Sequence, residues 1–182
     1  MPGQIRWHAV VAAGLALLLS ADVVAQSGLG SGSRPKSSTK CFNAPEIEAV
    51  AIVRAGMVIR DHARACARRG HDRDLINVWA AFDNTNAEEM KQAVEVRAKA
   101  FQRNWPDDPN AAQRDANETV ASRQLVDFAP AECVVLRDLV ESFKTWRDYM
   151  KHVRTVEVGQ VKMLYRTCPR RSPGEVPRSE QP

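Results

Sequence analysis

Between Cys41 and Gly70 the sequence carries the pattern of one long helix with a cysteine near each end. Asn43 or Ala44 can cap its start, and Pro45 fits the first helical position because its missing N–H has no partner to lose there. Gly70 supplies the left-handed residue that ends many helices. Charges that suit the helix dipole stand near the two ends: Glu46, Glu48, Arg64, Arg68 and Arg69. These signals predict a single helix across the whole stretch.

On a helical wheel the stretch has one apolar arc and one arc of mostly charged side chains. The apolar arc contains Ile47, Ala51, Ile52, Ala55, Val58, Ile59, Ala65 and Cys66. The other arc contains Arg54, Arg60, Asp61, Arg64 and Arg68, and three apolar residues intrude on it: Val50, Val53 and Met57. The first half is therefore apolar on nearly all sides, and it either lies centrally in the fold or presents a second apolar face to a partner. Central burial is the simpler interpretation.

Residues 1–25 have the features of a secretory signal peptide. Arg6 gives a positive start, and residues 9–19 form an apolar run too short to span a membrane comfortably. Val23 and Ala25 form a small-residue cleavage site, so the mature chain is expected to begin at Gln26. No later apolar stretch approaches about 20 residues, the length of a transmembrane helix. We therefore expect a periplasmic or secreted protein with no membrane span in its mature chain.

The mature part contains an even number of cysteines: Cys41, Cys66, Cys133 and Cys168. In an oxidising compartment such a set predicts two disulfides rather than free thiols. The chain also lacks C-x-x-C and C-x-x-C-H motifs, so the sequence indicates neither a thioredoxin-like redox role nor covalent haem. The cysteines are interpreted as structural.

Helix length favours one pairing of these cysteines. A straight helix over residues 45–69 separates its ends by roughly 35 Å, whereas disulfide-linked Cα atoms lie within about 7 Å. Cys41 then cannot reach Cys66 unless the leader folds back. If the last helix runs antiparallel to the first, Cys66 meets Cys133 and Cys41 meets Cys168, and both disulfides join the same two helices. Each would close a long loop worth about 3–5 kcal/mol, although a turn of the chain at Gly159 would leave other pairings open.

Further helices are indicated along the rest of the chain. Apolar residues between Leu75 and Phe82 fit a short helix, with a strand as the less favoured alternative. Thr85–Glu88 match a capping box that would start the next helix, which ends by Trp105. A thinner polar helix is predicted over Ala111–Phe128. The last long segment opens at Pro130 and shows an apolar seam: Leu136, Leu139, Phe143, Trp146, Met150 and Val153. Residues 154–166 are either a hairpin or, as favoured here, a continuing helix.

The predicted fold class is therefore all-α, a four- or five-helix up-and-down bundle stapled by two disulfides, with disordered ends. The signal peptide (1–25) is followed by a flexible Gly/Ser-rich leader (26–40). Residues 41–168 form the one helical domain, and residues 169–182 form a disordered tail rich in Pro, Arg and Ser.

No residue pattern indicates catalysis, a metal or a cofactor. His62 and Cys66 lie four residues apart on one helical face, a spacing that can grip a metal, but no further ligands match. A histidine packed beside a disulfide explains them better. The sequence also lacks G-x-S-x-G, H-E-x-x-H and phosphate-binding glycine loops, so we do not expect an enzyme.

The arginines of the long helix are the strongest candidates for a functional role. Arg60, Arg64 and Arg68 recur every four residues, with Arg54 nearby on the wheel. Arginine suits carboxylates and phosphates, so these residues together with the Val50, Val53 and Met57 patch predict a partner-binding face. The alternative is a solvated face with local pairs to Asp61 and Asp72.

The leading hypothesis is a non-catalytic exported envelope protein that binds another envelope protein or an anionic surface, as an inhibitor, adaptor or protective factor. A net charge of +4 supports an anionic partner only weakly, and no reader motif indicates nucleic acid. One alternative is a small-molecule or metal carrier that uses the interhelical core, whose candidate lining is aromatic: Trp79, Phe82, Phe101, Trp105, Phe143 and Trp146. The other is an enzyme without a recognisable motif.

Overall fold

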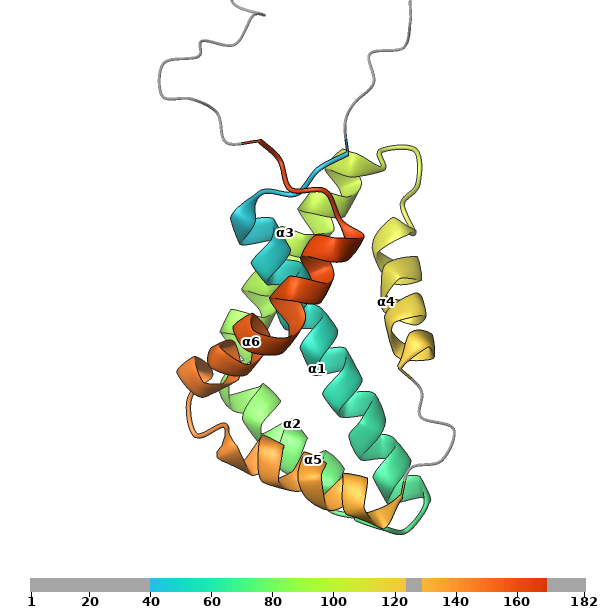
Figure 1. The fold of residues 1–182 in the computed structure, drawn as a ribbon, viewed down its shortest axis with the longest axis vertical. Helices are drawn as coiled ribbons and strands as arrows, with labels where there is room; N and C mark the ends of the chain where they lie inside the picture. The colour runs from blue at the N-terminus through green and yellow to red at the C-terminus, as the bar shows by residue number, and fades with distance from the viewer. Residues whose placement is uncertain (1–39, 124–128, 170–182) are drawn as a thin grey trace, which may run out of the picture. The chain divides into compact units, whose positions relative to one another are not determined.

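Six helices make up the part of the chain that the structure, a computed structural model, describes: residues 40–123 and 129–169 (Figure 1). They are α1 (Ala44–Arg68), α2 (Leu75–Thr85), α3 (Ala87–Asn104), α4 (Ala111–Ser122), α5 (Pro130–Ser142) and α6 (Trp146–Leu164). The all-α prediction is confirmed, with six helices in place of four or five. None of the helices in these ranges is both long and apolar enough to cross a membrane. The described residues do not include the predicted signal peptide (1–25), residues 26–39 of the predicted leader, residues 124–128 or residues 170–182 of the predicted tail.

α1 begins and ends where its sequence signals place it. The Asn43 side chain accepts a hydrogen bond from the Glu46 backbone N–H (3.0 Å), and the Glu46 carboxylate accepts one from the Asn43 N–H (2.8 Å). This reciprocal pair satisfies donors that the first helical turn leaves open. At the other end Gly70 adopts φ 74°, the left-handed conformation that stops a helix at little steric cost.

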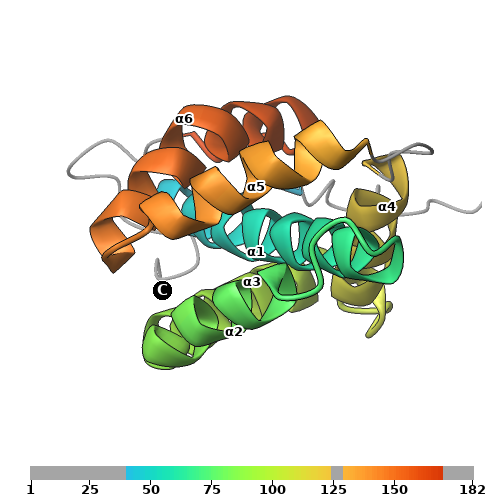
Figure 2. The same ribbon diagram turned by 90° about the horizontal axis from the view of Figure 1, so that it is seen from below.

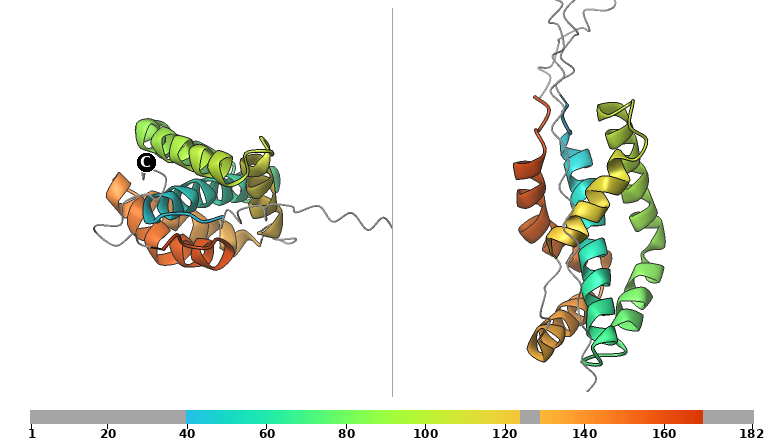
Figure 3. Two further views of the ribbon diagram at one scale, coloured as in Figure 1. Left: turned by 90° about the horizontal axis from the view of Figure 1, so that it is seen from above. Right: turned by 90° about the vertical axis from the view of Figure 1, so that its right-hand side faces the viewer.

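α1 packs against each of the other five helices. Figure 2 shows α5 and α6 on one side of α1 and α2 and α3 on the other, and the left view of Figure 3 shows the same division from the opposite end. Central burial of α1 is confirmed, since Val50, Ala51 and Ala63 are all fully buried. The prediction that Val50 belongs to a partner-binding patch is therefore wrong, because its side chain is 0% exposed in the bundle.

The junction between α2 and α3 differs from the predicted capping box. Thr85 is the last residue of α2, and its hydroxyl donates to the Ala81 carbonyl (2.8 Å) instead of capping α3. The side-chain amide of Asn86 likewise donates back to the Phe82 carbonyl (2.8 Å). Both polar side chains thus satisfy the end of α2, and α3 starts immediately afterwards.

The last segment is two helices rather than one. α5 ends at Ser142, and α6 starts after Thr145, which forms a capping box with Asp148. Between the two helices Phe143 is buried against the rings of Phe82 and Tyr149. The seam predicted to run through residues 136–153 is therefore interrupted. Residues 154–164 continue α6, so a helix replaces the hairpin alternative.

The two disulfides join Cys41 to Cys168 and Cys66 to Cys133, the pairing that the length of α1 favours, with Cα–Cα distances of 4.9 and 5.8 Å. They do not hold the same two helices, however. Cys133 lies in α5 and Cys168 follows α6, because the predicted single last helix is broken. Each disulfide therefore fixes a different helix to one end of α1.

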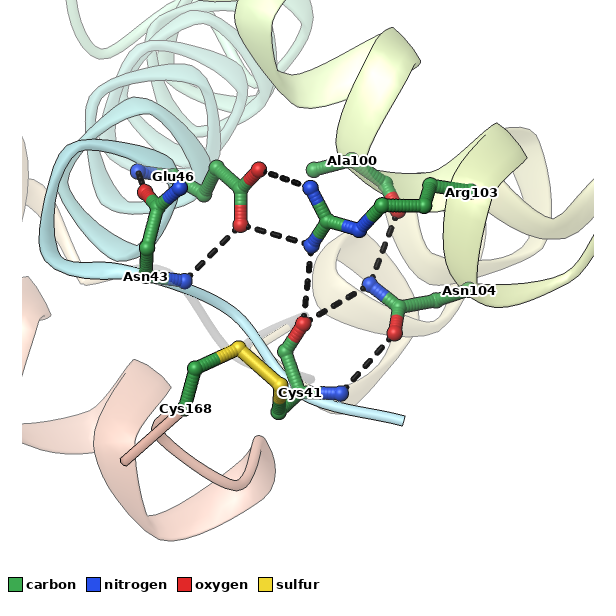
Figure 4. The surroundings of a disulfide bond; sticks show 7 residues. All are labelled: Cys41, Asn43, Glu46, Ala100, Arg103, Asn104 and Cys168. Carbon is green, nitrogen blue, oxygen red and sulfur yellow. Dashed lines mark hydrogen bonds and ion pairs between the residues drawn. A yellow bond between two sulfur atoms is a disulfide. The ribbon is translucent and has the colours of Figure 1, made fainter. Parts of the chain in front are cut away.

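Side chains of α3 reinforce the Cys41–Cys168 end (Figure 4). Asn104 accepts from the Cys41 N–H (2.8 Å) and donates to the Cys41 carbonyl (3.0 Å). Arg103 donates to the same carbonyl (2.9 Å) and pairs with Glu46. The hydrogen bond from Arg103 lowers the pKa of the Glu46 carboxyl below its ordinary value. The start of α1, the disulfide and the end of α3 thus form one anchored node.

The aromatic side chains that could have lined a ligand groove pack mainly against one another. One group surrounds Phe42 and contains Phe101, Trp105 and Tyr165. A second group centres on Tyr149 and contains Trp79, Phe82, Phe143 and Trp146. The Tyr149 hydroxyl donates to the Ile52 carbonyl (2.7 Å), which ties this group to α1. The interhelical core is accordingly filled by aromatic packing at both ends.

Candidate functional site

Two adjoining hollows flank the C-terminal half of α1 and share the residues Met57 and Arg60. The first has a volume of about 410 Å³ and lies between α1, α2 and α3. The second, of about 280 Å³, lies between α1 and α4. In the right view of Figure 3, α4 lies in front of α1 while α2 and α3 run along one side of it. We call the two hollows together the α1 groove.

The floor of the first hollow is mostly apolar. Val53 and Met57 of α1 are half-buried there beside Met90 of α3 and the buried ring of Trp79. Val94 stands at the rim and is 49% exposed. Two methionines give this floor side chains that can adjust to the shape of a bound group.

Basic side chains line both hollows. Arg60 and Arg64 line the groove from α1 and Lys91 lines it from α3, and all three are exposed. Among the described residues, neither Arg60 nor Arg64 takes part in an ion pair, whereas many other arginines do: Arg54, Arg97, Arg103, Arg114, Arg123, Arg137 and Arg154. The groove therefore offers guanidinium groups whose hydrogen-bonding capacity the fold leaves unused.

The alternative of local pairing is not supported at Asp72. This carboxylate accepts two hydrogen bonds of 2.6 Å from Arg137 of α5, which lower the pKa of Asp72 below its ordinary value. Arg68 is the last of the arginines that recur every four residues on α1, after Arg60 and Arg64. It is exposed and also has no ion pair in the described ranges. Two carboxylates line the groove, Asp61 and Asp83, compared with three basic side chains, so its lining carries an excess of positive charge.

Arg54 does not share the exposed face of Arg60 and Arg64, so its assignment to the partner-binding face is wrong. Its guanidinium is buried and pairs with Asp115 of α4 (2.8 Å), whose second oxygen pairs with Arg97 of α3 (2.7 Å). The Tyr165 hydroxyl also donates to Asp115. We call these four residues the Asp115 cluster. Burial, with the hydrogen bond to Asp115 next in importance, raises the pKa of the Tyr165 hydroxyl.

The Asp115 cluster holds α4 against α1, α3 and the segment after α6. Neither Arg54 Nε nor Arg97 Nε has a hydrogen-bond partner among the described residues, so one carboxylate faces two incompletely satisfied guanidinium groups. Sequence reasoning missed this cluster because Arg97 and Asp115 each look like polar surface residues of their own helices. By fixing α4, the cluster also positions one wall of the α1 groove.

His62 and Cys66 have structural roles. The His62 ring donates from Nε2 to the backbone carbonyl of Arg123 (3.0 Å), and Cys66 is bound in a disulfide. In the parts of the chain that the structure describes, no group of three or more His, Cys, Asp or Glu side chains could hold a metal ion. The interpretation of His62 as a packed histidine therefore fits its surroundings.

A third hollow, of about 450 Å³, lies between α1, α3 and α6. Its charged lining is balanced, with Glu48 and Glu89 opposite Arg147 and Arg154. Glu48 and Arg154 pair directly at 2.7 Å. This α6 hollow thus lacks the excess of positive charge that distinguishes the α1 groove.

Comparisons of the chain with protein-family models, curated proteins and solved structures give no significant match.

Proposed function

We propose that this chain is an exported, non-catalytic envelope protein that binds another protein through the α1 groove. The observation that carries the proposal is the position of Arg60 and Arg64, both exposed and without ion pairs to the described residues: Arg60 lines the apolar first hollow, and Arg64 lines the second hollow next to it. Arginine, methionine and aromatic side chains are enriched at protein interfaces, and unpaired guanidinium groups favour carboxylates. The two disulfides suit an oxidising compartment, which agrees with export to the periplasm or the medium.

The partner that fits the groove is an acidic amphipathic helix. The groove follows α1 from Val53 to Arg64, roughly 16 Å of helix, and is walled by helices on both sides. An amphipathic helix can place its apolar face in such a groove and its carboxylates against the basic rim. Charge complementarity of this kind sets the orientation and selects against basic partners.

The binding residues that this proposal assigns combine two sources. The sequence predicts four of them, all on α1: Val53, Met57, Arg60 and Arg64. Arg68 continues the same row of arginines beyond the groove. Met90, Lys91 and Val94 are contributed by α3. The partner would therefore contact α1 and α3 together rather than the surface of one helix.

A peptide titration tests the proposal. The probe is a short helical peptide with Val and Ala on one face and Glu on both flanks, titrated into the oxidised mature chain and followed in proton–nitrogen correlation spectra. We expect shifts at Met57, Arg60 and Val94, and weaker binding as salt is added, because screening reduces the attraction between exposed charges. A peptide with Lys in place of Glu should bind much more weakly.

The variants Arg60→Glu and Arg64→Glu, combined in one chain, should weaken peptide binding by at least about tenfold. The matched control combines Lys99→Glu and Lys151→Glu, which makes the same total change of charge at exposed positions of α3 and α6 outside the groove. Equal losses in both variants would indicate a non-specific charge effect. Shifts confined to the α6 hollow would place binding elsewhere, and either result would overturn the proposal.

A further inference from the structure

The outer face of α5 carries exposed apolar side chains that no other part of residues 40–123 and 129–169 covers. Val134 and Val135 are 59% and 68% exposed, and they share one side of the helix with Ala131 and Asp138. Asp138 stands on this side itself; Glu141, which pairs with Arg137 at 3.0 Å, and Glu132, which accepts from the Ala129 N–H, flank it. We call these residues the α5 face; it has the apolar stripe and acidic flanks expected of a ligand for the α1 groove.

The other exposed apolar side chains carry the wrong charge for the groove. On α6, Met163 and Leu164 stand beside Lys162 and Arg166, and Val156 stands near Arg154. On α3, Val94 belongs to the groove itself, and Val96, 38% exposed, lines the α6 hollow. Among the described residues, the α5 face therefore combines exposed valines with carboxylates and lies outside the groove.

The size and position of the two surfaces also match. Residues 131–138 of α5 extend roughly 10 Å, which fits within the roughly 16 Å of the groove. Figure 2 shows α5 and α3 on opposite sides of α1. α5 also packs on α2, but its exposed valines point to solvent, so the α5 face of one molecule cannot enter its own groove. The two complementary surfaces can meet only between different molecules.

We infer that a second copy of this chain docks its α5 face in the α1 groove. This inference rests on the proposed function, because it assigns a specific occupant to the same groove. Since the two surfaces are different and lie on opposite sides of α1, the contact is heterologous and can add further copies in the same way. Self-association also covers the groove, so it competes with any other acidic partner.

Sedimentation velocity of the oxidised mature chain tests the inference. The average mass should rise as the concentration is increased from micromolar to millimolar, and it should fall when salt is added. Val135→Lys on the α5 face, and the pair Arg60→Glu and Arg64→Glu in the groove, should each weaken association by at least about tenfold. Val156→Lys is the matched control, since it makes the same change at an exposed valine of α6.

Mixing the two defective chains gives the sharpest result. The Val135→Lys chain keeps an intact groove and the double arginine variant keeps an intact α5 face, so the mixture should form a dimer of one copy of each and grow no further. Failure of the mixture to form this dimer, or an undiminished association of either variant alone, would contradict the inference. Circular dichroism of each variant excludes unfolding as the cause.

The peptide titration separates the two proposals. If the acidic peptide binds the groove while the chain stays monomeric at all concentrations, the inference fails and the proposed function stands. If neither the peptide nor a second copy binds, both fail.

Discussion

Arg54 of α1 and Asp115 of α4 form an ion pair of 2.8 Å whose side chains are only 7% and 6% exposed. Asp115 also pairs with Arg97, so one carboxylate compensates two buried guanidinium groups from different helices. A buried charge that loses its partner is strongly destabilising. The attachment of α4 to the bundle therefore depends on Asp115 more than on any apolar residue of this short helix.

Asp115→Ala should lower the free energy of unfolding by about 3–5 kcal/mol, because it leaves Arg54 and Arg97 buried and unpaired. Denaturant unfolding of the oxidised chain measures this loss. Glu141→Ala is the control: it removes the exposed partner of Arg137 and should cost about 0–1 kcal/mol. A loss at Asp115 no larger than that of the control would show that the cluster is not the attachment of α4.

The frame of the fold could be predicted from the sequence because its signals are local. The cap at Asn43, the stop at Gly70 and the length of the helix between them determine where Cys41 and Cys66 lie, and this in turn selects the disulfide pairing. The break between α5 and α6 was equally local, since Thr145 and Asp148 form a capping box. It was missed because the apolar seam continues across it.

The candidate site could be predicted only in part. Periodicity alone cannot distinguish an arginine that faces solvent from one that faces a carboxylate on another helix. Arg54 lies on the same arc as Arg60 and Arg64, and its burial depends on Asp115, which is 61 residues away. For the same reason Met90 and Lys91 were not assigned to the groove, because a single sequence does not give the packing of α3 on α1.

The two disulfides should be reduced in a fixed order. Cys66 and Cys133 are 0% and 1% exposed, whereas Cys41 and Cys168 are half-buried near the chain ends. Since a reductant must reach a sulfur atom, limited reduction should open Cys41–Cys168 first. Alkylation followed by peptide mass spectrometry identifies the opened pair. Labelling of Cys66 before Cys41 would contradict this order.

Removal of either disulfide by paired Cys→Ala substitutions should lower stability by about 2–5 kcal/mol. The chain-entropy contribution depends only weakly on loop length, and the two sequence separations, 127 and 67 residues, are both long. The Cys66 and Cys133 pair should cost more, because its sulfur atoms are buried and their loss also leaves a cavity. Denaturant unfolding compares the two variants; an equal or reversed order would show that packing around the buried sulfurs adds nothing.

Two glycines should respond to alanine with opposite signs. Gly159 lies inside α6 with open space where a Cβ would stand, so Gly159→Ala should stabilise the protein by about 0.5–1 kcal/mol. Gly70 has φ 74°, where a Cβ is strained, so Gly70→Ala should destabilise it by about 1–2 kcal/mol. Thermal unfolding of the two variants measures both effects. Equal signs would contradict the assigned end of α1 or the helical state of residue 159.

Acidification should lower stability in two steps. Burial holds the pKa of His152 below its ordinary value of 6.5, with Glu157 opposing this shift more weakly. The unfolded chain therefore binds a proton at this histidine at a higher pH than the folded chain does. The contribution of His152 to stability is complete above pH 6.5 and is lost as the pH falls below that value. The second step begins below about pH 4.5, the ordinary pKa of a glutamate such as Glu46. The Arg103 hydrogen bond lowers the pKa of that carboxyl in the folded chain, so its protonation there costs stability.

Denaturant unfolding at a series of pH values resolves these steps. In His152→Gln the free energy of unfolding should depend less steeply on pH between pH 6.5 and pH 4.5, since the side chain that titrates there is removed. In Glu46→Gln the dependence of the unfolding free energy on pH should become less steep below pH 4.5 instead. This variant should also be less stable at neutral pH, because the ion pair with Arg103 is gone. An unchanged upper slope in His152→Gln would show that burial of this histidine is not what makes folding sensitive to mild acid.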